Sequence, residues 1–255
     1  MTSSAPANVT FSLGVFGERG GRFGPHKDGW GIAFKEEHDF RLVKEGAPAA
    51  ASACLRFLQA HDIQSEIVLS HLRLATVPSA ASYTNTHPFA RELGGHCHVF
   101  AHNGSVPGVF DDPRFAPKWN FPLGQTDSEW AFCALMDRLR YAVVPGEAMN
   151  IEKKLPVIQQ WATELAQHGT INFLLSDSEY LYAHRSTNLF FVQRQCLSEL
   201  ESLASDSFRV AVVGASDRTQ RISLIATQPL SAHEQWTALA LGEVAVFRRG
   251  ERIVL

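Results

Sequence analysis

The feature that most constrains this chain is a long series of short segments in which apolar and polar residues alternate. Alternation with period 2 predicts half-buried β-strands. Helical spacing is confined to three segments, 49–61, 127–142 and 151–169. A parallel α/β fold would alternate strands and helices along the chain, so clustered helices and hairpin-like strands favour an α+β fold, with layered antiparallel sheets and helices outside. The predicted strands are WGIAFK (30–35), FRLVKEG (40–46), EIVLSHLRLA (66–75), CHVFAHNG (97–104), INFLLSD (171–177), EYLYAHR (179–185), LFFVQR (189–194), FRVAVVG (208–214), ISLIATQPL (222–230) and EVAVFRRGERIVL (243–255).

Composition and charge narrow the class of protein. The 255 residues are 45% hydrophobic and 19% charged, and no linker or repeat divides them, so we expect one domain over residues 1–255. A formal charge of -3 gives no basic surface for nucleic acid or an anionic membrane, so the expected partner is a small-molecule substrate. Because no apolar run reaches the ~18 residues of a membrane span and the first ten residues do not resemble a secretion signal, we expect a cytoplasmic protein.

Three patterns that could indicate a cofactor have plainer interpretations. The cysteines are widely spread and form no CxxC pair, which indicates free thiols rather than a disulfide framework or a zinc ribbon. The glycine-rich segment 17–31 fits no nucleotide-binding motif and precedes a predicted strand rather than a helix. HCH at 96–98 has workable metal-ligand spacing, but a polar strand edge is the simpler interpretation, and no further ligand is evident. We therefore expect no metal.

Two charged residues lie where predicted elements meet loops. Arg73 ends an apolar strand, and a buried guanidinium needs an anionic partner, which is either a carboxylate of the protein or the carboxylate of a ligand held bidentately. Thr126 and Glu129 form a T-x-x-E capping box that places Asp127 in the first turn of a helix. Asp127 then either complements the helix dipole or accepts a ligand ammonium.

Asn103 and Gly104 follow a predicted apolar strand. An Asn-Gly pair between apolar runs is usually a hairpin turn. By itself, the pair does not indicate chemistry.

Five ordered motifs make the chain similar to a known family. In this order and at these separations they resemble the glutaminase domain of the class II glutamine amidotransferases, which are N-terminal-nucleophile hydrolases. A short, stand-alone branch of that family also shares the late STNL (186–189) and IATQPL (225–230) segments. The resemblance covers the chain from Phe11 to Val254 and implies a four-layer αββα sandwich of two antiparallel sheets. The five motifs are GPHKDGWGI (24–32), SHLRLAT (70–76), NTHPF (85–89), AHNG (101–104) and TDSE (126–129).

The resemblance also implies roles for single residues. The side-chain amide of Asn103 and the backbone N–H of Gly104 match the family's oxyanion hole, which stabilises the negative charge that develops when the γ-carboxamide carbon is attacked. Arg73 matches the clamp on the substrate α-carboxylate. Asp127 matches the acceptor of its α-ammonium. Together these two charges would select a free amino acid or a γ-glutamyl group.

Further positions are implied to surround the substrate. The backbone around His26 matches the glycine-rich wall beside the nucleophile, and Thr76 and Val77 match the segment that lines the substrate. The resemblance implies no metal and no organic cofactor.

The family's nucleophile has no counterpart in this sequence. It is a cysteine exposed by removal of the initiator methionine, whereas position 2 here is Thr2, and the short strand that carries the cysteine is expected to be missing. Three explanations are open. The sequence begins at an internal methionine downstream of a native Met-Cys, or Thr2 is the nucleophile, or the protein is a catalytically silent γ-glutamyl-binding protein or regulatory subunit.

The resulting prediction is an amidohydrolase of the glutamine amidotransferase type. It cleaves the γ-amide of glutamine or a γ-glutamyl compound through a γ-glutamyl thioester and releases ammonia or an amine. Because no residues remain for a synthase domain, any ammonia acceptor is expected on a partner protein. Without its cysteine, the chain is expected to be inactive.

Overall fold

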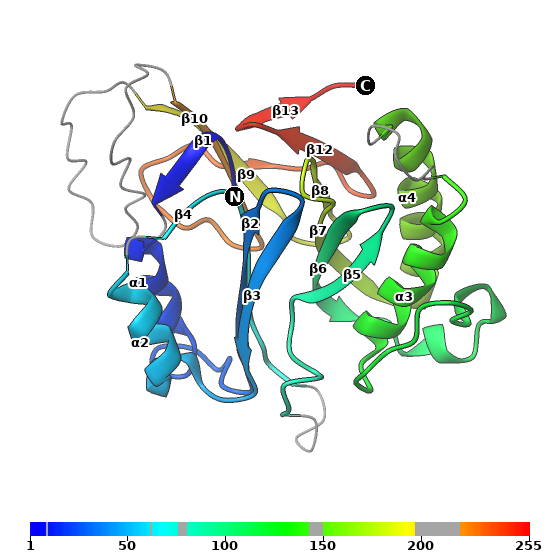
Figure 1. Ribbon diagram of the computed structural model, residues 1–255, viewed down its shortest axis with the longest axis horizontal. Helices are drawn as coiled ribbons and strands as arrows, with labels where there is room; N and C mark the ends of the chain where they lie inside the picture. The colour runs from blue at the N-terminus through cyan, green and yellow to red at the C-terminus, as the bar shows by residue number, and fades with distance from the viewer. Residues whose placement is uncertain (9, 62, 76–80, 143–149, 197–219) are drawn as a thin grey trace.

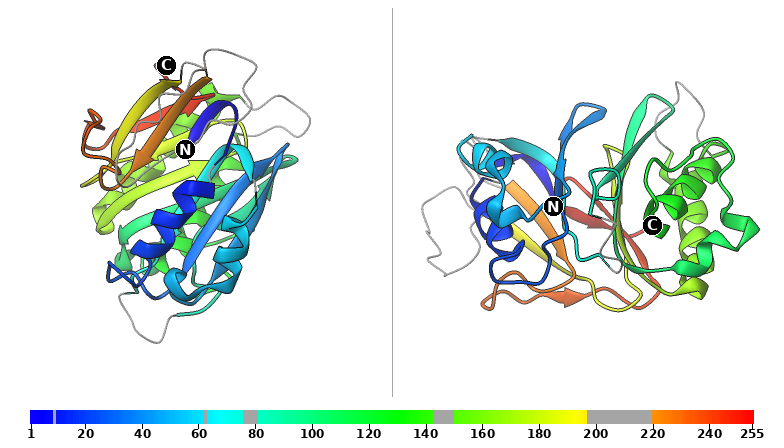
Figure 2. Two further views of the ribbon diagram at one scale, coloured as in Figure 1. Left: turned by 90° about the vertical axis from the view of Figure 1, so that its left-hand side faces the viewer. Right: turned by 90° about the horizontal axis from the view of Figure 1, so that it is seen from below.

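The computed structural model describes residues 1–255 apart from 9, 62, 76–80, 143–149 and 197–219. Two antiparallel sheets lie between two pairs of helices (Figure 1). Helices α1 (Thr10–Arg19) and α2 (Ala53–Gln59) cover the first sheet, and α3 (Asp127–Leu139) and α4 (Ile151–Leu165) cover the second, as Figure 2 also shows. No helix among the described residues is long and apolar enough to cross a membrane.

The strands of each sheet are far apart in the sequence. The first sheet has seven strands in the order β11-β9-β10-β1-β4-β2-β3, and the second has six in the order β13-β12-β8-β7-β6-β5. Those of the first sheet are β1 (Thr2–Asn8), β2 (Trp30–Glu36), β3 (Asp39–Glu45), β4 (Gln64–Leu72), β9 (Phe190–Cys196), β10 (Gln220–Ala226) and β11 (Thr237–Ala238). Those of the second are β5 (Phe89–Leu93), β6 (His96–Ser105), β7 (Thr170–Ser176), β8 (Leu181–His184), β12 (Val244–Arg248) and β13 (Glu251–Ile253). Short 3-10 helices are η1 (Ala49–Ala51), η3 (Pro107–Phe110), η4 (Pro113–Phe115) and η5 (Ala166–His168).

Alternating side chains build separate cores on the two faces of each sheet. On β2, Ala33 packs between the sheets, whereas Ile32 and Phe34 pack under α1 and α2. On β6, Val99 packs between the sheets and Phe100 packs under α3 and α4. Successive side chains of a strand point to opposite faces, so apolar residues at consecutive positions bury both faces. The layers are therefore helix, sheet, sheet and helix, which confirms the predicted α+β sandwich.

Most elements lie where the sequence predicts them. The helical segments are confirmed as α2, α3 and α4, and the predicted strands as β2, β3, β4, β6 to β10, β12 and β13. The strand predicted at 208–214 lies outside the described residues.

Two elements near the start of the chain were not predicted. The segment Thr2–Asn8 reads as low-complexity sequence, yet it forms β1 between β10 and β4. Helix α1 contains glycine, which disfavours helices. A Cβ at Gly17 would lie 2.9 Å from the Leu55 side chain of α2, so this glycine lets the two helices approach closely. In both cases tertiary contacts override the local pattern.

Candidate functional site

A cavity of about 750 Å³ lies between the two sheets. The first sheet lines it with β4 and β10, and the second lines it with β6 and β7. Loop residues 23–26, 187–189, 227–228 and 230, together with Met1 and residues 13, 16 and 19 of α1, complete the wall. Segments that the sequence singles out as motifs thus meet in one place, although they are distant along the chain. A cavity of this size suits a small-molecule ligand.

Asn103 and Gly104 lie within β6, so the hairpin-turn interpretation of this pair is wrong. Asn103 pairs with Asn172 of β7, and Gly104 pairs with Ile171. Gly104 has a φ of +146°, and a Cβ there would lie 2.0 Å from the carbonyl oxygen of Thr170, so the close approach of β7 requires glycine. Asn103 is exposed and lines the cavity. Within the described residues its side-chain amide makes no hydrogen bond, which leaves it available to a ligand.

His102 holds the end of β6 in place. Its Nε2 lies 3.1 Å from the carbonyl oxygen of Thr170, and its Nδ1 lies 2.9 Å from the hydroxyl of Ser128. Because a carbonyl oxygen only accepts, Nε2 carries the proton and Nδ1 accepts from the serine. Burial lowers the pKa of His102, while the hydrogen bond to Thr170 and the charge of Asp127 oppose that shift. The neutral ring therefore joins β6 to β7 and to α3.

Asp127 lies in the first turn of α3, directly after the N-cap Thr126, as the sequence predicts. Its Oδ2 accepts from the backbone N–H of Val106 at 2.6 Å and from Ser105 Oγ at 3.4 Å, and its Oδ1 accepts from the N–H of Ser128 at 2.8 Å. The side chain is half-buried. Ser128 Oγ also lies 3.3 Å from Oδ1, so four polar groups of the protein surround the carboxylate. The ligand role of Asp127 stays a prediction.

The capping box of α3 is only half formed. Thr126 Oγ1 accepts from the N–H of Glu129 at 3.1 Å, as expected. The Glu129 carboxylate instead accepts from the N–H groups of Leu123 and Gly124 and pairs with Arg91 of β5 at 2.7 Å. The buried guanidinium is a stronger partner than a backbone N–H. Glu129 therefore fixes the loop before α3 to the second sheet.

Arg73 directly follows β4 and is 7% exposed. Its guanidinium donates to the carbonyl oxygen of Asp28 at 3.4 Å, and its backbone N–H donates to Gly29 at 2.8 Å. Burial lowers the pKa of Arg73, and the charge of Asp28 opposes that shift. The Asp28 carboxylate accepts from the backbone N–H of Ala75 at 2.9 Å, so Asp28 contacts Arg73 through its carbonyl oxygen and acts on it through its charge. The clamp on a ligand carboxylate stays a prediction.

A half-buried histidine, His71, and a buried one, His87, link Arg73 to the end of β6. The rings of His71 and His87 lie 4.3 Å apart, and three of their four ring nitrogens have no hydrogen-bond partner within the described residues. Burial, and then proximity to His102, lowers the pKa of His71 to about 3. Burial, and then proximity to His71, lowers the pKa of His87 well below its usual value. Arg73 adds to both shifts, so residues of three motifs share one electrostatic environment.

These histidines predict a loss of stability in acid. In the unfolded chain a histidine titrates near ~6.5, whereas His71 and His87 stay neutral in the fold to much lower pH. Below pH ~6.5 the unfolded state therefore binds more protons, and the free energy of unfolding falls by about 1.4 kcal/mol per pH unit for each such histidine. Denaturant titrations between pH 7.5 and 4.5 measure this slope.

The matched variant is His87→Phe, which removes one titrating ring between His71 and Phe89. Below pH ~6.5 its unfolding free energy should depend less steeply on pH. The slope should be smaller by about 1.4 kcal/mol per pH unit, which corresponds to one bound proton fewer in the unfolded state. The exposed His61→Gln serves as a control and should keep the slope of the unmodified chain. Equal slopes for His87→Phe and the unmodified chain would contradict the prediction.

The remaining predicted site residues fall in different places. His26 is half-buried and lines the cavity. Thr76 and Val77 lie outside the described residues. Thr2 is 1% exposed in β1, its hydroxyl has no hydrogen-bond partner within the described residues, and its neighbour Met1 lines the cavity. Of the other predicted residues, Asn103 lines the cavity, whereas Arg73, Gly104 and Asp127 are not among the described residues that do so.

Several polar residues of the cavity were not predicted. Asn172 of β7 lies beside Asn103, and Thr187, Asn188 and Gln228 lie in the loops that follow β8 and β10. The signal for the last three was the pair of late segments that the family resemblance shares, STNL (186–189) and IATQPL (225–230). Asn172 has no such signal, because it interrupts an apolar strand with a single amide.

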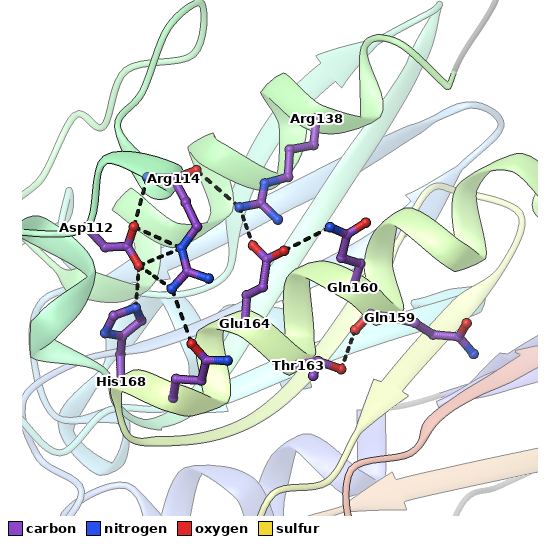
Figure 3. Close-up of polar contacts among 9 residues, drawn as sticks. Asp112, Arg114, Arg138, Gln159, Gln160, Thr163, Glu164 and His168 are labelled. Atoms are coloured by element: carbon purple, nitrogen blue, oxygen red, sulfur yellow. Dashed lines mark hydrogen bonds and ion pairs between the residues drawn. The ribbon is translucent and has the colours of Figure 1, made fainter.

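An ionic cluster anchors the segment after β6 to the outer helices (Figure 3). Asp112 accepts from Arg114 at 2.6 Å and from His168 at 2.8 Å, and these hydrogen bonds, that of Arg114 above all, hold the pKa of Asp112 well below its usual range. Arg138 of α3 donates to the carbonyl oxygen of Arg114 and pairs with Glu164 of α4 at 2.8 Å. The chain that leaves β6 is thereby fixed to both helices.

Cys54, Cys97 and Cys133 are free thiols. Burial raises the pKa of Cys97 to about 12 and that of Cys133 to about 11, and burial together with the charge of Glu45 raises that of Cys54. These thiols are therefore protonated at neutral pH, and none of the three lines the cavity. The sequence correctly predicts free thiols at these positions. In the same described residues no group of three His, Cys, Asp or Glu side chains could hold a metal ion.

Comparison with known proteins identifies one family. A sequence profile described as class-II glutamine amidotransferases matches residues 1–255. YafJ of Escherichia coli K12, named as a glutamine amidotransferase, is 37% identical over 257 residues, which cover 100% of this chain and 98% of that protein. A Pseudomonas aeruginosa crystal structure described as a glutamine amidotransferase is 34% identical, with a TM-score of 0.70 over 93% of this chain and 91% of that one. At 13% identity, glutamine phosphoribosylpyrophosphate amidotransferase of B. subtilis shares the fold, with a TM-score of 0.59 over 96% of this chain and 45% of that one.

Proposed function

The chain belongs to the class II glutamine amidotransferases, and on this premise we propose that it hydrolyses the γ-amide of glutamine or of a γ-glutamyl compound and releases ammonia or an amine. The observation that carries the proposal is the end of β6. There, Asn103 presents an unpaired amide to the cavity, directly before a glycine that close strand packing requires. An amide donor at the cavity wall, followed directly in the chain by the N–H of Gly104, suits the oxyanion of an acyl-transfer reaction.

The proposed reaction has two halves. A thiolate attacks the γ-carbonyl carbon, and the electron pair of the C=O bond moves to oxygen, where the Asn103 amide and the Gly104 N–H stabilise it. Collapse of this intermediate breaks the C–N bond, and the nitrogen leaves as ammonia or an amine after it takes the proton that the α-amine of the nucleophile received from the thiol. Water then attacks the γ-glutamyl thioester, which yields the γ-carboxylate and regenerates the thiol. Arg73 and Asp127 hold the α-carboxylate and the α-ammonium of the substrate.

The proposed nucleophile is an N-terminal cysteine thiol outside residues 1–255. The described cysteines support this choice, because Cys54, Cys97 and Cys133 have raised pKa values and do not line the cavity. We expect ammonia release from glutamine by a form of the protein that begins with a native Met-Cys upstream of Met1, and none from the chain Met1–Leu255. An enzyme-coupled ammonia assay measures both.

The same longer form with its cysteine replaced by alanine is the matched control, and it should be as inactive as the chain Met1–Leu255. Equal ammonia release from all three forms would reject a cysteine nucleophile, and release from the chain Met1–Leu255 alone would favour Thr2. An in-frame stop codon directly before the codon of Met1, with no start further upstream, would exclude the longer form itself.

A second candidate function is a catalytically silent γ-glutamyl-binding protein or regulatory subunit. The absence of a described cysteine from the cavity wall favours it. Calorimetry with glutamate, together with the ammonia assay, distinguishes the two functions, because a silent protein binds glutamate and no form of it releases ammonia. If the enzyme delivers ammonia to a second reaction, we propose that the acceptor site lies on a partner protein, and we place both proteins in the cytoplasm, where free thiols persist.

A further inference from the structure

Asn172 hydrogen-bonds to two walls of the cavity at once. It is 2% exposed, lines the cavity and lies opposite Asn103 on the neighbouring strand. Its Oδ1 accepts from three consecutive backbone N–H groups, those of Ser186 at 3.1 Å, Thr187 at 3.0 Å and Asn188 at 3.2 Å. Its Nδ2 donates to Thr187 Oγ1 at 2.7 Å and to the carbonyl oxygen of Asn103 at 3.4 Å.

The last of these bonds acts on the peptide unit that contains the proposed oxyanion donor. The carbonyl of Asn103 and the N–H of Gly104 belong to one planar peptide, in which they point in opposite directions. A carbonyl held toward Asn172 on β7 therefore turns the Gly104 N–H away from β7. On that side, the pairing of β5 with β6 ends at Phe100, so no strand partner competes for this N–H.

The same bond strengthens the donor. A hydrogen bond accepted by the C=O group polarises the whole amide, which makes its N–H more acidic and a better donor. The bonds from Oδ1 meanwhile fix the loop that carries Thr187 and Asn188 against the same strand pair. One side chain thus orients the donor peptide and the facing wall together.

We infer that Asn172 is a positioning residue of the active site, which orients and polarises the Asn103–Gly104 peptide for stabilisation of the oxyanion. The inference rests on the proposed function. The neighbours of Asn172 on β7, Ile171 and Phe173, are apolar and pack into the core. Asn172 faces the cavity instead, and each of its polar atoms is used there.

Asn172→Asp separates orientation from mere packing. The aspartate keeps an oxygen for the N–H groups of residues 186–188, but it cannot donate to the Asn103 carbonyl and places a negative charge beside it. We expect kcat for glutamine hydrolysis to fall about tenfold or more, with KM within a few-fold of the unmodified enzyme, because the oxyanion forms only in the transition state. Asn172→Ala removes every contact and should show the same kcat loss.

Ser176→Ala is the matched control on the same strand. Ser176 is fully buried and donates to the carbonyl oxygen of Tyr180 at 2.8 Å, away from the cavity. It should lower the melting temperature in the way any lost buried hydrogen bond does, and leave kcat unchanged. If Asn172→Asp and Asn172→Ala retain the kcat of Ser176→Ala, Asn172 is structural only and the inference is overturned, while the proposed function stands.

A spectroscopic readout keeps the inference testable without turnover. The ¹H resonance of the Gly104 amide should move upfield in whichever Asn172 variant folds, because its N–H loses polarisation, and it should stay in place in Ser176→Ala. An unmoved Gly104 resonance in the Asn172 variants overturns the inference. If that resonance moves but no form of the protein hydrolyses glutamine, the proposed function fails and the control of the Asn103–Gly104 peptide by Asn172 is supported.

Discussion

Asn103→Asp is expected to lower kcat for glutamine hydrolysis by about 10²- to 10³-fold, with almost no change in the melting temperature. The two side chains have nearly the same size, and the side chain at position 103 is exposed in the cavity, so the fold tolerates the change. The chemistry does not, because aspartate replaces an N–H donor with a negative charge facing a developing negative charge. The measurement compares Asn103→Asp with the unmodified protein: kcat is measured in the cysteine-bearing form, and the melting temperature is measured in that form and in the chain Met1–Leu255.

Asn150→Asp is a control with the same change of charge. Asn150 is the exposed N-cap of α4, where aspartate caps as well as asparagine, and it is not among the described residues that line the cavity. It should leave both kcat and the melting temperature unchanged. If Asn103→Asp turns over within a few-fold of the unmodified enzyme, Asn103 is not an oxyanion donor, and the catalytic assignment is wrong.

Arg73→Ala is expected to weaken glutamate binding by about 2 to 5 kcal/mol, the usual cost of removing one member of a buried charge pair. Arg73 is 7% exposed, so a ligand carboxylate that it binds is largely removed from water. Arg73→Lys keeps the charge but loses the planar guanidinium that binds a carboxylate through two hydrogen bonds. Its affinity for glutamate should therefore lie between that of the unmodified protein and that of Arg73→Ala. Isothermal titration calorimetry with glutamate measures all three affinities.

The competing partner of Arg73 is Asp28, and the two interpretations predict different outcomes. If Arg73 serves only contacts within the protein, Arg73→Ala lowers the melting temperature and leaves the affinity for glutamate unchanged. Arg138→Ala is the control, because it breaks a partly exposed ion pair between α3 and α4 without touching the cavity. It should lower the melting temperature slightly and leave glutamate binding intact.

The sequence predicts the layers of the fold well, because the pattern that defines them is local. The apolar alternation of WGIAFK and CHVFAHNG directly records the two buried faces of β2 and β6. The sequence of β1 shows no such alternation. Its residues are small and weakly apolar, and they form a strand because β10 and β4 flank them on both sides.

The candidate site is only partly predictable, for a related reason. The motif AHNG identifies Asn103 and Gly104 through the family resemblance, but the turn statistics of Asn-Gly pairs misplace them. The conformation of Gly104 is set by its contact with Thr170 on another strand. The two residues are far apart in the sequence, so a prediction from neighbouring residues cannot include this contact. Asn172 is missed for the same cause, since its hydrogen-bond partners come from β6 and from the loop after β8.

The close approach of Gly104 to Thr170 ties the chemistry of this protein to the register of one strand pair. A slip of β6 against β7 by a single residue would point Asn103 toward the α3 layer and would bring a residue with a Cβ against the Thr170 carbonyl. The need for glycine at this position therefore allows only one register between β6 and β7. A misaligned sheet would lack the oxyanion site altogether, so completion of the second sheet and assembly of that site are the same folding event.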